Sequence, residues 1–274
     1  MLRAGFWLIA CVSLVAAQDQ AQAPDKGPAP DKNQAPDTNK DKVSVPLSSP
    51  SQPATIKIHL VSGSITVTGG SGTEVVVESK AGFHEGPGDV PAGMHRLDTG
   101  QRSGLNIAED HNVVTIGTGP AGGAGDLSIQ VPVNSSVTLK ALNGGHVDVT
   151  GVNGELDIEN MNGPITLKGV SGSVTAHALN GGITVALDKV TAEKPMSFTC
   201  MNGPIDVTLP ADTRARLRMK TDHGSVYTDF EVKLDTPDTG KNVKGDKTVI
   251  GSINGGGPEF RFETVSGNIL LHKK

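Results

Sequence analysis

Imidazole and carboxylate side chains, the groups that hold zinc and related ions, gather between Lys80 and Asn112. The group comprises His84, Glu85, Asp89, His95, Asp98, Glu109, Asp110 and His111. Their spacing matches no compact ligand motif, so we predict neither a metal nor a cofactor. We interpret residues 80–112 as an irregular, glycine-rich loop. Because long loops often carry function, the three histidines there are candidates for a binding surface.

A second candidate surface is a run of cations. Arg214, Arg216, Arg218 and Lys220 alternate with apolar residues, so on a strand all four project from one face. Such a stripe could bind an anionic polysaccharide, lipid headgroups or an acidic protein. The interpretation that we favour is a solvated face whose charges discourage aggregation between sheet edges.

Catalytic chemistry has little support in the sequence. Asp148, Asp157 and Asp206 do not recur at one position of a repeat, so we interpret them as outward polar residues rather than a glycosidase pair. The Gly-x-Ser-x-Gly motif of a nucleophile elbow in its strand-then-helix context is missing. Cys200 follows Phe198 in an apolar stretch, which is typical of a buried, inert thiol. We predict a protein that is not an enzyme.

Composition narrows the range of partners. The 274-residue chain has a formal net charge of -5, which gives no reason to expect nucleic acid. Aromatic residues make up 3%, which argues against recognition of sugars or bases by aromatic platforms. The expected partner is a protein or polysaccharide of the cell envelope or surface.

The first 17 residues are typical of a secretory signal peptide. Arg3 precedes an apolar run from Phe6 to Ala16, and small residues follow at the expected cleavage site. The sequence before Cys11 is similar to a bacterial lipobox, although the apolar run continues past it. We expect an exported protein, periplasmic or at the cell surface, and membrane-anchored only if the leader stays uncleaved or Cys11 is lipidated.

Residues 18–53 form a linker rich in Pro, Asp, Lys and Gln, in which Ala-Pro-Asp-Lys recurs. Such a segment has too few apolar residues to fold, so we expect it to be disordered.

Internal repetition organises residues 54–274. An apolar residue, then Asn or Ser, then Gly, precedes a short alternating strand, with a spacing of roughly ten to twenty residues. Glycine accepts positive φ, and asparagine tolerates it better than most residues, so we place these pairs at bends. The Asn-Gly pairs are Asn143-Gly144, Asn153-Gly154, Asn162-Gly163, Asn180-Gly181 and Asn202-Gly203.

The repeats predict an all-β domain over residues 54–274, interrupted by the loop at 80–112. Near-identical successive units favour a β-solenoid or β-roll, in which short strands stack in parallel and like residues align in columns. The alternative is an antiparallel meander or sandwich, because Asn-Gly is also a hairpin signal.

The strands punctuated by Asn-Gly and Ser-Gly resemble the bacterial β-strand-repeat family called "putative adhesin", a domain of unknown function related to the head domains of autotransporter-like adhesins. The resemblance covers residues 54–274 and is clearest from Val137 to Phe230. It implies an exported, adhesin-like interaction module and supplies no catalytic residues. The alternatives are a glycan-active β-helix enzyme and a structural protein of the envelope.

Overall fold

The structure is a computed structural model that describes residues 42–79, 105–118, 125–191, 193–235 and 248–274. The chain divides into two units, residues 1–37 and 38–274, and all described residues belong to the second. The predicted signal peptide, Cys11, linker residues 18–41, His84 and His95 lie outside the described residues. Within the described part, no helix is long and apolar enough to cross a membrane.

The regular secondary structure of the described residues consists of β-strands. In chain order they are β1 (Lys42–Pro46), β2 (Ala54–Gly70), β3 (Glu74–Ser79), β4 (Leu105–Asp110), β5 (Val113–Thr118), β6 (Leu127–Pro132), β7 (Ser135–Thr150), β8 (Asn153–Asn162), β9 (Ile165–Asn180), β10 (Ile183–Val190), β11 (Met196–Asn202), β12 (Ile205–Leu209), β13 (Ala215–His223), β14 (Val226–Thr228), β15 (Lys233–Leu234), β16 (Thr248–Ile253), β17 (Glu259–Ser266) and β18 (Ile269–Lys273).

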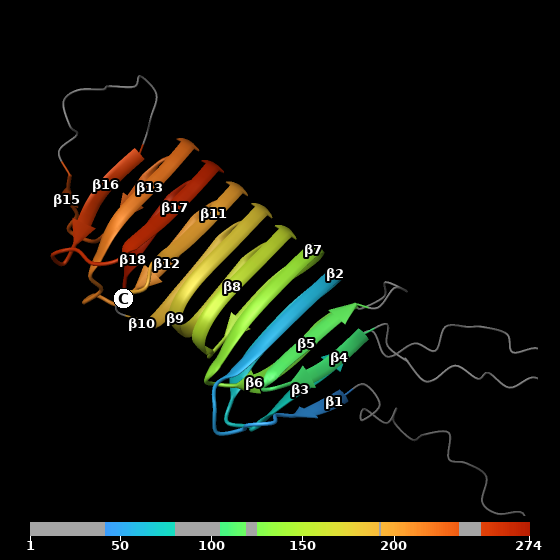
Figure 1. Cartoon of the computed structure of the whole chain (residues 1–274). Helices are drawn as coiled ribbons and strands as arrows, with labels where there is room; N and C mark the ends of the chain where they lie inside the picture. Colours follow the sequence, from blue (N-terminus) through green and yellow to red (C-terminus); the bar gives the residue numbers. More distant parts are fainter. Residues whose placement is uncertain (1–41, 80–104, 119–124, 192, 236–247) are drawn as a thin grey trace, which may run out of the picture. The chain divides into compact units, whose positions relative to one another are not determined.

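Successive coils of the chain stack in parallel, so the predicted solenoid is confirmed (Figure 1). Val137 of β7 pairs with Leu156 of β8, and Leu156 pairs with Val174 of β9. Each coil supplies one segment to each of two parallel ladders. The first ladder runs β5, β2, β7, β8, β9, β11, β17, β13. The second runs β6, β2, β7, β9, β10, β12, β18, β14.

The first and last coils of this domain are inserted inside the stack rather than placed at its ends. Strand β2 lies between β5 and β7, and β17 lies between β11 and β13. Antiparallel strands cover three of the four ends of the parallel ladders: β4 pairs with β5, β3 with β6, and β16 with β13. The antiparallel alternative therefore applies only to these caps, which protect the parallel edges.

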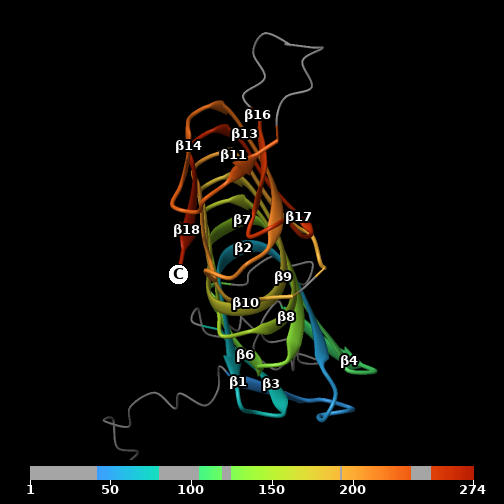
Figure 2. The same cartoon turned by 90° about the vertical axis from the view of Figure 1, so that its left-hand side faces the viewer.

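The core consists of columns of like residues, as the alternating pattern predicts. One column runs through the second ladder from β2 to β18, and its six members there are 0% exposed: Ile65, Val147, Ile165, Ile183, Ile205 and Ile269. On the first ladder, Phe198 and Phe262 are register partners whose rings stack with centroids 5.1 Å apart. Figure 2, turned by 90°, shows these coils one behind another.

At one corner of the coils the glycines stack backbone on backbone. Gly163, Gly181 and Gly203 have φ of 124°, 139° and 152°. A Cβ on Gly181 would lie 2.4 Å from the carbonyl carbon of Gly163, and one on Gly163 would lie 1.9 Å from the carbonyl oxygen of Gly145. Glycine is therefore required here both for its backbone angle and for close approach.

The neighbouring asparagines have a role different from the one we inferred for them. The positive φ falls on Gly163, Gly181 and Gly203, whereas Gly144 and Gly154 do not have it. The asparagines Asn143, Asn162, Asn180 and Asn202 form a column in strand register. Each amide nitrogen donates to the side-chain oxygen of the preceding asparagine, at 3.3, 3.1 and 3.0 Å along the column. Asn153-Gly154 lies elsewhere, at the start of β8, where Asn153 donates to Asn134 at 3.0 Å.

Two predicted boundaries are wrong. Lys42–Pro46, placed in the linker, form β1, which pairs antiparallel with β3. Leu105–Asp110, placed in the irregular loop, form β4. Both strands are short caps that lack the repeated sequence, an apolar residue followed by Asn or Ser and then Gly, by which we recognised strands elsewhere.

We expect Gly181→Ala to destabilise the domain by about 2–4 kcal/mol, because it combines an unfavourable φ with a backbone clash. Gly117→Ala is the matched control, since its added Cβ would meet only the His59 carbonyl oxygen, at 3.9 Å. Chemical denaturation followed by circular dichroism measures both. Equal stability of the two variants would contradict the close stacking of the corner.

Candidate binding surfaces

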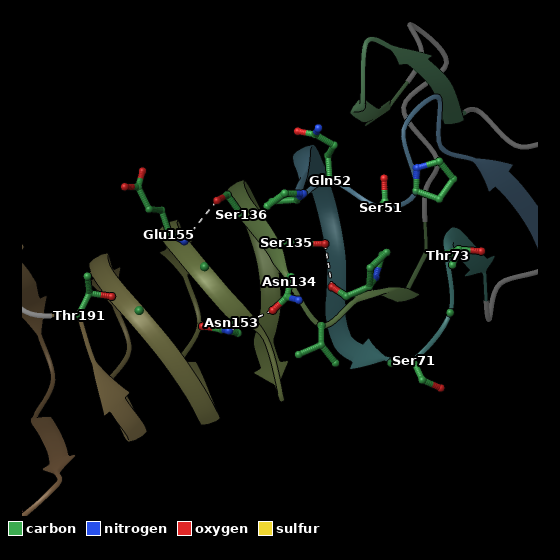
Figure 3. Close-up of a pocket in the computed structure, with 18 of the residues that line it drawn as sticks. Ser51, Gln52, Ser71, Thr73, Asn134, Ser135, Ser136, Asn153, Glu155 and Thr191 are labelled. Carbon is green, nitrogen blue, oxygen red and sulfur yellow. Dashed lines mark hydrogen bonds between the residues drawn. The ribbon is translucent and has the colours of Figure 1, made fainter.

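A groove of about 800 Å³ follows the corner at which the strands of the first ladder begin (Figure 3). We call it the polar groove. Its floor is formed by the starts of β7 and β8, together with Gly172 and Ser173 in β9. Its walls come from the turn 50–53 before β2, the turn 70–73 after β2, and Thr191 and Lys194 beyond β10.

Hydroxyl and amide groups dominate this groove. The hydroxyl of Ser136 accepts a hydrogen bond from the backbone nitrogen of Glu155 at 3.3 Å, and Asn134 accepts one from Asn153. Within the described part of the chain, the side chains of Ser51, Gln52 and Thr73 make no hydrogen bond to the protein, and all three are exposed. The groove therefore offers groups that can both donate and accept.

One wall of the groove is held by residues that we had placed in irregular segments. Residues 47–53, which we call the strap, lie against the turn between β4 and β5. The side chain of Asn112 accepts from the Ser49 nitrogen at 3.0 Å and donates to the Gln52 and Pro53 carbonyls, both at 3.2 Å. Asn112 has φ of 65°, and with His111 it forms a two-residue turn of positive φ. The sequence Asp110-His111-Asn112 was the signal from which this turn could have been predicted.

Glu109 holds the N-terminal end of the strap, at Ser48, by hydrogen bonds. Its carboxylate accepts from the Ser48 hydroxyl at 2.7 Å, from the Ser48 nitrogen at 3.1 Å and from the Asn112 nitrogen at 2.9 Å. The hydrogen bonds from Ser48 hold the pKa of the Glu109 carboxyl below its ordinary value. Glu109 is thus a positioning residue of the strap.

Charge in the polar groove is confined to one ion pair among the described residues that line it. Lys194, on a wall, pairs with Glu155 at the start of β8 on the floor, and Glu155 is the one carboxylate among these residues. A second hollow of about 790 Å³ shares Thr191 with it and is more strongly charged. The charged residues lining the second hollow are Asp188, Lys189, Glu193, Asp212 and Arg214.

The predicted cation stripe lies on one outward face, but acids are interleaved with it. Arg216 is beside Glu259 in register and forms an ion pair with Asp235 at 2.9 Å. Lys220 is beside Glu263, and Arg218 is beside Arg261. Arg261 in turn bonds Glu263 at 2.7 Å, and this hydrogen bond raises its pKa. Asp235 directly follows β15, and Glu259 and Glu263 belong to β17, which is inserted next to β13, so the residues adjacent to the stripe in sequence gave no sign of these acids.

The candidate histidine that the structure describes, His111, is exposed at the tip of the β4–β5 turn and pairs with Asp110. Among the described residues, no group of three or more His, Cys, Asp or Glu side chains could hold a metal ion.

The three strand acids do not come together. Asp157 lies on the first ladder, whereas Asp148 and Asp206 lie on the second with Thr166 and Thr184 between them. Three strand spacings separate the last pair by about 14 Å, which exceeds the distance between glycosidase carboxylates. Asp148 and Asp206 each face a histidine, His146 at 3.5 Å and His272 at 3.6 Å.

A family model described as "Toastrack DUF4097" matches residues 37–272. The chain belongs to the Toastrack family. The match begins within the predicted linker, just before β1, in agreement with the corrected domain boundary.

Solved structures similar to this Toastrack chain include a "putative cell adhesion protein" from Clostridium sporogenes, with 11% identity and a TM-score of 0.48, covering 85% of this chain and 99% of that one. A "putative adhesin" from Bacteroides fragilis has 11% identity and a TM-score of 0.30, covering 85% and 96%. A search of curated proteins gave no match.

The reactivity of Cys200 can be used to test whether the interior between the stacked coils is closed to solvent. It is 1% exposed, its thiol donates to the Gly181 carbonyl at 3.0 Å, and burial raises its pKa. A raised pKa keeps the thiol protonated at neutral pH, so in a Cys11→Ser background we expect alkylation at least about 100-fold slower in the native than in the unfolded chain. Thr184→Cys, on an exposed position, is the reactive control. Equal rates for Cys200 and this control in the native protein would contradict the burial.

Proposed function

We propose that this protein is an exported, adhesin-like binding module of the cell envelope or surface, and that it binds a neutral polysaccharide in the polar groove without altering it chemically. The observation that carries the proposal is the concentration of hydroxyl and amide side chains along the starts of neighbouring strands and in the adjoining turns, where Ser51, Gln52 and Thr73 are exposed. Export rests on the signal-like leader, and the adhesin-like role rests on the repeat pattern.

The chemistry of the groove selects the ligand. Hydroxyl and amide groups that both donate and accept match the hydroxyls of a sugar chain, which do the same. The single ion pair, Lys194 with Glu155, leaves little net charge to attract a charged polymer. The described residues that line the groove include no aromatic side chain, so each contact is weak, and affinity would come from many repeated contacts along an extended chain.

The groove favours binding over hydrolysis. Glycosidases place two carboxyl groups about 5–9 Å apart across the bond to be cleaved. Among the described residues that line the polar groove, Glu155 is the one carboxylate, and Lys194 neutralises its charge.

The test is binding of immobilised neutral polysaccharides by the full chain and by Gln52→Ala/Thr73→Ala. We expect the double variant to lose roughly 10-fold or more in affinity, because it removes two groups that can bond the ligand. Thr68→Ala/Thr184→Ala, at exposed positions of the second ladder, is the matched control and should bind normally. Binding only to peptides, or equal loss in both variants, would contradict the assignment of ligand or groove.

A further inference from the structure

Exposed apolar side chains form a ladder at the end of the first-ladder strands opposite the polar groove. Five of the nine large apolar side chains exposed among the described residues belong to it, and Leu142 and Met201 are 49% and 48% exposed. With the half-buried Leu179, one residue comes from each of six adjacent strands. In stack order the apolar ladder is Val61, Leu142, Met161, Leu179, Met201 and Val265.

The flanks of the apolar ladder differ in charge. On one side lies the asparagine column, whose amides bond one another and are neutral. On the other side, two residues earlier on each strand, lies a row of mixed charge. In stack order this charged row is His59, Lys140, Glu159, His177, Thr199 and Glu263.

We propose that the apolar ladder binds the apolar ladder of a second copy of this chain, with the two stacks antiparallel. Five strand spacings make the ladder about 24 Å long, so these exposed apolar side chains are contiguous rather than scattered singly over the surface. A two-fold axis parallel to the strands, placed midway along the ladder, reverses the order of the six residues. Val61 then opposes the partner's Val265, Leu142 opposes the partner's Met201, and Met161 opposes the partner's Leu179. Side chains of similar length therefore meet at every position.

The charged row specifies the same antiparallel arrangement. The axis places Glu159 opposite the partner's His177, and His59 opposite the partner's Glu263. Lys140 faces the partner's Thr199, so like charges do not meet anywhere in this row. Complementary charge of this kind sets the orientation of an interface more than its strength.

The interface ends one row farther from the ladder. Lys57 and Arg261 occupy the first and last positions of the next row along these strands, and the same axis would bring Lys57 opposite the partner's Arg261. Repulsion there limits contact to the apolar ladder and its two flanks, which makes a small interface and a weak, reversible dimer. The polar groove is about 20 Å away along the strands, six residues from Leu142 to Ser136, and stays open.

Dimerisation is measured by sedimentation velocity of the full chain in a Cys11→Ser background, at concentrations up to about 1 mM, the upper limit for a weak complex. We expect the mass to rise towards that of a dimer. Leu142→Glu/Met201→Glu should lower the association constant at least about 100-fold, because it buries opposed carboxylates. Leu234→Glu, at an exposed apolar residue outside the ladder, should dimerise normally. A monomer throughout the range, or equal loss in the control, would overturn the proposal.

Orientation is tested in the same background by cysteine cross-linking. A mixture of Val61→Cys and Val265→Cys chains should form a disulfide-linked dimer, while each variant alone should not, because its own thiols lie at opposite ends of the interface. Cross-linking of Val61→Cys with itself would instead indicate a parallel arrangement and would contradict the charge pairing.

Discussion

Coil-to-coil contact of the backbone at the corners is the constraint on which the rest of this structure depends. Gly163, Gly181, Gly203 and Gly267 leave no space for a Cβ, and the nitrogen of each donates to a carbonyl of the adjacent coil at 2.7 to 3.1 Å. The parallel ladders therefore continue through the bend rather than stopping at it. The backbone hydrogen-bonding groups of each bend find their partners in the bends of the adjacent coils. This is why the glycine-containing sequence must recur in every coil.

Regular stacking determines what kind of function the domain can have. Apolar columns make up most of the interior, with a few buried polar side chains such as Asn160 and Thr264, so the outward faces and the two edges of the first ladder are the surfaces open to a partner. At one edge, turns of different length leave the polar groove. At the other, the last outward residue before each bend forms the apolar ladder. Like residues align along the stack, so both surfaces are long and shallow and suit extended partners better than small substrates.

Sequence predicted the repeated part of this domain well, because period-two alternation and the Asn-Gly phrase are local signals. The inward columns, the outward Arg216 and Arg218, and the burial of Cys200 all follow from them. It could not predict that β2 and β17 are inserted between other coils, because register between distant segments leaves no local trace. For the same reason the acids beside the cation stripe and the strap held by Asn112 were missed. The asparagine column could not be predicted either, because it depends on the strand register. That register places asparagines that we had assigned to bends next to one another, where their side chains hydrogen-bond.

The most direct test of the corner contact is amide hydrogen exchange measured residue by residue by NMR. The account predicts that the amides of Gly163, Gly181, Gly203 and Gly267 exchange as slowly as those of buried strand residues such as Ile165 and Ile205, because they are bonded between coils. Exchange of these glycine amides at the rate of exposed turns, while the strand amides stay protected, would contradict it.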